Sequence, residues 1–162
     1  MGEWFTRASI WIAMAAWTWG IVEGRRSSTS VFRSRAPWLF GLIFYAIHIV
    51  LAYEIFYEWS HTVAWEKTAL DTAAATGVKT GVGLLLNFLF GAWLIWDFSK
   101  RWNDRIGGTR YVTEGLVFFF ILNGAIVFGD GPVVALGVIL CLAIAAKWIL
   151  ERRQRSHPPR AT

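Results

Sequence analysis

One short segment of the sequence gathers carboxylates and a histidine at spacings that suit a metal ion. Glu54, Glu58 and His61 follow one another at intervals of four and three residues, so a helix continuing through them would place all three side chains on one face. Carboxylates and a neutral imidazole suit zinc, iron or manganese, and Asp130, assigned to the same outer side, is a further candidate ligand. The spacing therefore allows a mononuclear site. A di-metal centre is disfavoured, because helical sites of that kind use two Glu-x-x-His pairs and this chain has one.

The same segment also fits a helix that is leaving a membrane. Its aromatic side chains are of the kind that form a belt at the boundary between lipid and water; they are Tyr53, Tyr57, Trp59 and Trp65. In this interpretation the acidic side chains are simply solvated. We prefer it, because single Glu and His residues are common at such surfaces.

A second histidine, His48, lies inside an apolar run. It follows Trp38 by ten residues, which at about 1.5 Å per residue places it about 15 Å into the hydrocarbon. An ionisable group at that depth is costly and marks a candidate haem ligand, quinone hydrogen-bond donor or proton relay. The alternative is a neutral imidazole bonded to a neighbouring helix, with Asn87 and Asn123 as the candidate partners. No second histidine lies at matching depth, so a bis-histidine haem would need His48 from two copies of the chain.

Composition and charge pattern predict the elements that must position these residues. The chain has 162 residues, of which 56% are hydrophobic and 17% charged, whereas soluble domains carry about a quarter charged residues. The charges lie between long apolar runs, as in multi-pass membrane proteins, whose helices satisfy their own backbone hydrogen bonds. We therefore predict one all-α transmembrane helical domain over residues 1–162. Its five expected spans lie at about 4–22, 38–57, 80–98, 112–128 and 133–150.

Two further segments complete the predicted architecture. The alanine-rich stretch at about 61–76 carries both charges and apolar residues, which favours a short helix on the outer surface ending near Gly77. The basic segment 151–162 is expected to form a cytoplasmic tail.

The arginines and lysines predict the orientation of the spans, because basic residues stay on the cytoplasmic side. The loop after the first span, the loop after the third span and the tail carry most of them: Arg25, Arg26, Arg33, Arg35, Lys100, Arg101, Arg105, Arg110, Arg152, Arg153, Arg155 and Arg160. The N-terminus is then outside, the C-terminus inside, and the chain a multi-pass protein of the inner membrane. Because the basic residues are dispersed over three segments, they favour contact with anionic headgroups and not nucleic-acid binding.

Small residues recur on the faces of the expected spans. Gly83, Asn87 and Gly91 follow at intervals of four, and Gly137 lies on a similar face of the last span. Such faces let another helix approach closely. We therefore expect contacts between the spans and with other transmembrane helices, in a homo- or hetero-oligomer.

The segments EWSHTVAWEKTALDTAAATG and NFLFGAWLIWD resemble parts of a group of small bacterial multi-pass membrane proteins whose activity is not known. In these a Trp-Ser-His segment follows the second span and an asparagine lies in the third. The matching positions here are Trp59, Ser60, His61, Thr68, Thr72, Gly77 and Asn87. More histidines precede Trp-Ser-His in that group, where this chain has Tyr57 and Glu58, so the resemblance does not imply a shared metal site.

The sequence favours a binding role over a catalytic one and leaves enzyme activity open. It contains no P-loop, dinucleotide fingerprint, Gly-x-Ser-x-Gly or His-Glu-x-x-His motif. Our first hypothesis is a non-catalytic accessory or assembly subunit of a membrane complex. The second is a metal- or haem-binding redox protein that uses the Glu/His segment or His48. The third is a pathway for a small solute or for protons through His48, Asn87 and Asn123.

Overall fold

A computed structural model describes residues 2–23, 31–102, 109–129 and 131–156, and within these ranges the chain is helical without strands. The all-α prediction is therefore confirmed for the described residues. The elements in chain order are α1 (Gly2–Glu23), α2 (Val31–Ile55), α3 (His61–Thr76), α4 (Val82–Trp102), α5 (Thr109–Ile121), the π-helix η1 (Leu122–Val127) and α6 (Pro132–Ser156).

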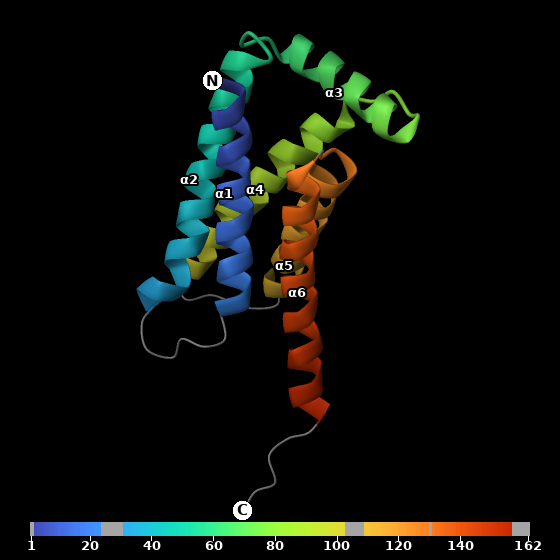
Figure 1. Ribbon diagram of the computed structural model, residues 1–162. Helices are drawn as coiled ribbons and strands as arrows, with labels where there is room; N and C mark the ends of the chain where they lie inside the picture. The colour runs from blue at the N-terminus through green and yellow to red at the C-terminus, as the bar shows by residue number, and fades with distance from the viewer. Residues whose placement is uncertain (1, 24–30, 103–108, 130, 157–162) are drawn as a thin grey trace, which may run out of the picture.

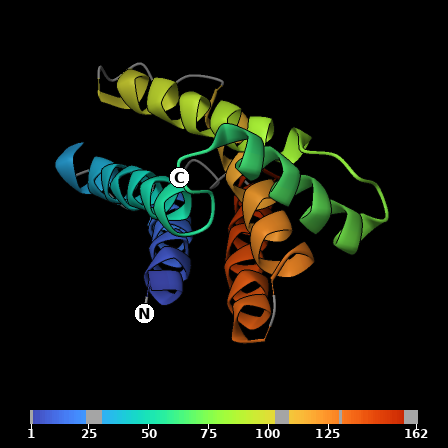
Figure 2. The same ribbon diagram turned by 90° about the horizontal axis from the view of Figure 1, so that it is seen from above.

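The long helices run alternately up and down, and α3 lies across one end of the bundle (Figure 1). Seen from that end, α1 and α2 form one pair, α5 and α6 form another, and α4 runs obliquely beside both (Figure 2). Helix α1 contacts α5 and α6 as well as α2, so it connects the two pairs.

Four segments are long and apolar enough to cross a membrane: Arg35–Ile55, Val82–Lys100, Thr109–Val127 and Pro132–Gln154. They correspond to the second to fifth predicted spans, so the chain has the composition of a multi-pass membrane protein. Helix α1 has 22 residues, but it is not among the segments that meet the length and hydropathy requirements for a span. The first predicted span stays a prediction.

Helices α1 and α2 each contribute a tryptophan that packs against a glycine of the other helix. Trp17 of α1 lies over Gly41 of α2, and a Cβ atom at Gly41 would overlap the indole. In return Trp38 of α2 lies over Gly20, where a Cβ atom would be 2.7 Å from the indole Nε1. Of the buried side-chain polar atoms in the described residues, Trp17 Nε1 alone has no hydrogen-bond partner. Each helix thus contributes a Trp-x-x-Gly unit to a close helical contact.

An aromatic cluster joins the helix pairs through the middle of the bundle. Phe90 of α4 stacks on Phe120 of α5 with ring centroids 3.7 Å apart, and it meets Trp17 and Tyr45 edge to face at 5.5 and 5.9 Å. Such contacts add to the packing of apolar area. The cluster therefore ties α1, α2, α4 and α5 into one core.

The chain reverses sharply between α2 and α3. Helix α2 ends at Ile55, two residues before the predicted end of the second span, and Glu58 and Trp59 adopt left-handed backbone angles with φ of 49° and 56°. No continuous helix therefore runs from Glu54 to His61. Glu54, Glu58 and His61 do not share the single face that a continuing helix would have given them, because two left-handed residues end the helical repeat.

Capping defines both ends of α3. Ser60 has extended backbone angles and its Oγ accepts a hydrogen bond from Val63 N, as an N-cap does. Gly77 ends the helix in the left-handed region, with φ of 79°, and donates its N–H to Ala73 O. Trp65 then packs against Gly81, just before α4, leaving no room for a Cβ atom there. These contacts fix α3 against the start of α4.

Helix α5 continues into a turn of π-helix, η1, in which Phe128 N donates to Asn123 O five residues earlier at 3.0 Å. A π-turn contains one more residue than an α-turn, so it changes which side chains face the bundle. Here Gly124 and Ala125 face the interior, and Ala125 packs against Gly137 of α6. Short π-helices are frequent at functional sites. The space beside η1 is therefore a candidate position for such a site.

Candidate functional site

A cavity of about 230 Å³ lies between the long helices, and every one of them contributes to its wall. Its lining residues come from α1, α2, α4, α5, η1 and α6: Ile10, Trp11, Met14, Trp17, Tyr45, His48, Asn87, Phe90, Val117, Phe120, Ile121, Gly124, Ala125 and Val133. None of these residues carries a fixed charge. A mainly apolar, aromatic cavity with a few polar groups is the usual form of a small-molecule site.

Two of the three intramembrane polar residues selected from the sequence line this cavity together. His48 lies on α2 and Asn87 on α4, and Tyr45, about one turn from His48, joins them. The Tyr45 hydroxyl lies 2.7 Å from the backbone oxygen of Asn87 and 2.9 Å from its side-chain oxygen. The cavity therefore has a polar edge built from facing helices.

Asn123 does not belong to this polar edge. Its side-chain nitrogen donates to Phe119 O at 2.9 Å, one turn earlier on its own helix, and its backbone oxygen accepts the π-helical bond from Phe128. The neighbouring Gly124 and Ala125 line the cavity in its place. The displaced register of η1 explains why a sequence position near mid-span does not face inward.

His48 forms its hydrogen bond with α1. The ring Nδ1 lies 2.8 Å from the backbone oxygen of Thr6, whereas the sequence pointed to Asn87 or Asn123 as candidate partners. A backbone carbonyl can only accept, so Nδ1 carries the proton in this bond. The bond gives the buried imidazole a partner and adds a polar link to the α1–α2 contact.

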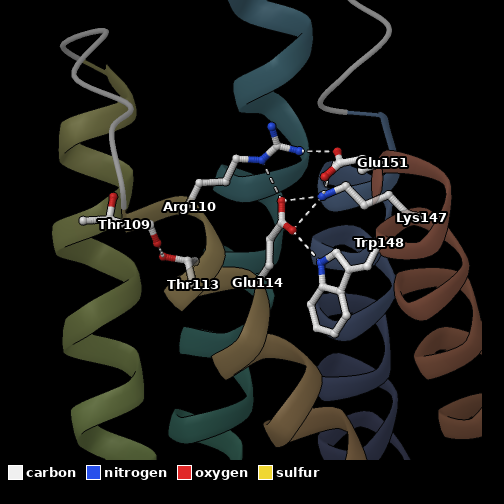
Figure 3. A network of polar contacts seen from close by, with 7 residues as sticks. All are labelled: Thr109, Arg110, Thr113, Glu114, Lys147, Trp148 and Glu151. Atoms are coloured by element: carbon white, nitrogen blue, oxygen red, sulfur yellow. Dashed lines mark hydrogen bonds and ion pairs between the residues drawn. The ribbon is translucent and has the colours of Figure 1, made fainter. Parts of the chain in front are cut away.

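A second polar cluster, which we call the ionic network, joins the first turns of α5 to the last turns of α6. It consists of Arg110, Glu114, Lys147, Trp148 and Glu151 (Figure 3). Lys147 Nζ lies 2.6 Å from both carboxylate oxygens of Glu114, Arg110 Nε donates to Glu114 at 2.8 Å, and Trp148 Nε1 donates to it at 2.8 Å. Glu151 accepts from Arg110 at 2.9 Å and pairs with Lys147 at 3.4 Å.

The central pair of the ionic network is buried, and the charges of the whole network balance. The side chains of Glu114 and Lys147 are only 3% and 7% exposed. Two acidic and two basic groups sum to zero, which is the arrangement that makes charge inside a membrane protein tolerable. Each of the five side chains is bonded to at least one other across or along the two helices, so the ionic network holds α5 against α6.

Sequence reasoning passed over Lys147 and Glu151 as candidate residues. The signal was present: Lys147 is a charged residue inside the predicted span 133–150, and Glu151 follows it by four residues. An ionisable residue within a span calls for a partner of opposite charge on another helix. That rule leads from Lys147 to Glu114.

Two of the residues proposed as metal ligands, Glu54 and His61, form hydrogen bonds with aromatic neighbours. Glu54 accepts from Trp59 Nε1 at 2.5 Å, and His61 Nδ1 lies 2.9 Å from the Tyr53 hydroxyl. Among the described residues no three His, Cys, Asp or Glu side chains are grouped so that they could hold a metal ion. Asp130 lies outside the described residues, so the metal site stays a prediction.

The three glycines selected as packing positions each face another element. A Cβ atom at Gly83 would lie 3.3 Å from Thr68 of α3, one at Gly91 would lie 2.9 Å from the Tyr45 ring of α2, and one at Gly137 would lie 2.6 Å from Ala125 of η1. The Gly91 contact has a direct consequence for the cavity. Because Gly91 lacks a side chain, the Tyr45 ring packs directly against α4, and its hydroxyl meets Asn87 there.

The cavity is thus the place where the fold brings sequence-selected polar residues of different helices together. Comparison of the chain with protein-family models, with curated proteins and with solved structures finds no match.

Proposed function

We propose that this protein binds a small neutral molecule within the membrane, in the cavity between its helices. The observation that carries the proposal is the convergence of His48 and Asn87, from different helices, on one mainly aromatic cavity of about 230 Å³. An apolar cavity of roughly 150 Å³ already holds benzene. The cavity is therefore large enough for a single substituted ring.

We further propose that all five long helical segments cross the inner membrane, with the N-terminus outside. Helix α1 packs along α2 and is a wall of the cavity, so it shares the surroundings of the other spans. Figure 1 shows four helix ends at the same end of the bundle: the C-terminal ends of α1, α4 and α6 and the N-terminal end of α5. The basic segments adjoin those ends, which supports a cytoplasmic position for them.

Fluorobenzene is a suitable probe of the cavity, because it is a small apolar ring that fluorine NMR detects directly. We expect the purified protein in bicelles to give a bound fluorine resonance in addition to that of the lipid-dissolved probe. Val117→Phe places a ring in the cavity, since Val117 is fully buried in its wall, and should remove the bound resonance. Leu142→Phe is the matched control, because Leu142 is 63% exposed on the outside of α6. Equal spectra for the wild type and Val117→Phe would contradict the proposal.

The accessory-subunit hypothesis is a second candidate, and a groove on the outside of the bundle favours it. Between α1 and α2 lies an apolar groove of about 730 Å³. Three of its lining residues are alanines, Ala15, Ala16 and Ala36, which let another helix approach closely. A transmembrane helix of a partner protein is the occupant that this composition suits.

Site-specific photo-crosslinking in intact membranes tests the groove. A photoreactive residue in place of Ala15, which is exposed in the groove, should yield a discrete protein adduct. The same residue in place of Leu142 should react with lipid only. A lack of protein adducts at position 15, or equal adducts at both positions, would count against a partner helix in this groove.

A further inference from the structure

The bonding of His48 determines what this residue offers to a ligand. His48 Nδ1 donates a hydrogen bond to the carbonyl oxygen of Thr6, and the two atoms are 2.8 Å apart. A charge on the ring is costly inside a span, so the imidazole is neutral and its second nitrogen, Nε2, is an acceptor. His48 therefore contributes a hydrogen-bond acceptor to the wall of the cavity.

Asn87, which contributes to the polar edge from α4, offers a ligand different hydrogen-bonding groups. The Tyr45 hydroxyl donates its proton to Asn87, to the backbone oxygen, the side-chain oxygen or both. An asparagine amide has two N–H donors besides its oxygen, and with the oxygen occupied these donors are what Asn87 has left for a ligand. The edge of the cavity thus combines an imidazole acceptor on α2 with an amide donor on α4.

The remaining wall selects for shape and charge. Trp11, Trp17, Phe90 and Phe120 are aromatic, and flat rings pack well on such surfaces in stacked or edge-to-face contacts. None of the lining residues carries a fixed charge that could balance an ion. The wall therefore favours a flat, uncharged molecule.

We infer that the cavity selects a neutral ring bearing a hydroxyl group, a phenol or quinol, and that this hydroxyl donates a hydrogen bond to His48 Nε2. The inference rests on the proposed ligand-binding function. The hydroxyl fits the acceptor that the Thr6 bond creates, and the aromatic wall encloses the ring. Asn87 lines the same cavity from another helix, so its amide is the donor we assign to an oxygen at a second position of the ring.

Two probes of equal size separate hydroxyl recognition from mere filling of the cavity. 4-Fluorophenol and 4-fluorotoluene differ by a hydroxyl against a methyl group, and the affinity of each is measured by fluorine NMR in bicelles. We expect the ratio of the two affinities to fall about three- to tenfold in His48→Phe, the effect of one net hydrogen bond. The solubility of each probe in lipid is the same in the samples of the wild type and the variant, so it cancels when their affinity ratios are compared.

A second measurement needs no substitution in the cavity. In the wild-type protein labelled with ¹⁵N-histidine, the His48 resonances should show a protonated Nδ1 and an unprotonated Nε2. The Nε2 resonance should shift when 4-fluorophenol is added and stay unchanged with 4-fluorotoluene. This readout remains available if His48→Phe does not fold.

The outcomes distinguish the inference from the function on which it rests. If fluorobenzene and both substituted probes bind, but the affinity ratio and the Nε2 resonance do not respond to the hydroxyl, the inference is overturned and the cavity remains a ligand site. If no probe binds in a way that Val117→Phe removes, both fall. A hydroxyl-dependent ratio that is lost in His48→Phe, or a phenol-specific Nε2 shift, supports the inference.

Discussion

Glu114→Gln is expected to lower the free energy of unfolding by about 3–5 kcal/mol, the usual cost of removing one member of a buried ion pair. Glu114 is 3% exposed and accepts hydrogen bonds from Arg110, Lys147 and Trp148. Glutamine leaves Lys147 buried with only the more distant Glu151, 3.4 Å away, as its acidic partner. Unfolding of the protein in mixed micelles by increasing detergent measures the change.

Two variants test whether this cost comes from the unpaired charge. The double variant Glu114→Leu with Lys147→Leu removes the central pair together, and its loss should be much smaller than that of Glu114→Gln, since apolar side chains often replace a buried pair at little cost. Glu66→Gln, on the exposed surface of α3, should change the unfolding free energy by less than about 0.5 kcal/mol. A cost for Glu114→Gln no larger than that for Glu66→Gln would show that the ionic network does not hold α5 and α6 together.

Gly41→Ala is the second substitution with a large expected effect. The added methyl group would overlap the Trp17 indole, which is 1% exposed and packs against the rings of Tyr45 and Phe90. We expect a loss of about 1–3 kcal/mol, as for other overpacked cores, although alanine is the better helix former. The unfolding free energy in mixed micelles is again the measurement.

A glycine with open surroundings supplies the matched control. Nothing lies within 4 Å of a Cβ atom at Gly115 of α5, so Gly115→Ala should be neutral or stabilise by about 0.5–1 kcal/mol through helix propensity alone. In a Trp17→Phe background the penalty of Gly41→Ala should shrink, because the smaller ring makes room. If Gly41→Ala and Gly115→Ala behave alike, the reciprocal Trp–Gly contact is not a determinant of stability.

The helical architecture was predictable because it depends on long apolar runs, which a sequence shows directly. The second to fifth runs each coincide with a helix that can cross a membrane. The boundary at Ile55 was not predictable, since nothing in the residue types of Glu58 and Trp59 requires left-handed backbone angles. The same two residues interrupt the helical repeat between Glu54 and His61, so these side chains do not share one helical face.

The polar edge of the cavity could be predicted in part. His48 and Asn87 were selected because polar residues within spans are costly and need partners. Their actual partners, the Thr6 carbonyl and the Tyr45 hydroxyl, depend on how far each helix is shifted along its neighbour. Asn123 was selected by the same rule but lies in the π-helical register, which intervals counted along the sequence do not reveal.

The partner of His48 is a main-chain atom, and this has a consequence for how the protein can vary. A side-chain replacement at position 6 keeps the acceptor atom of the bond, because that atom belongs to the main chain. A slip of α1 along α2 by one residue would carry this oxygen about 1.5 Å along the axis and about 100° around it. The hydrogen bond of the imidazole therefore depends on the alignment of α1 with α2. The nitrogen resonances of His48 can be used to measure whether these two helices have packed in the correct register.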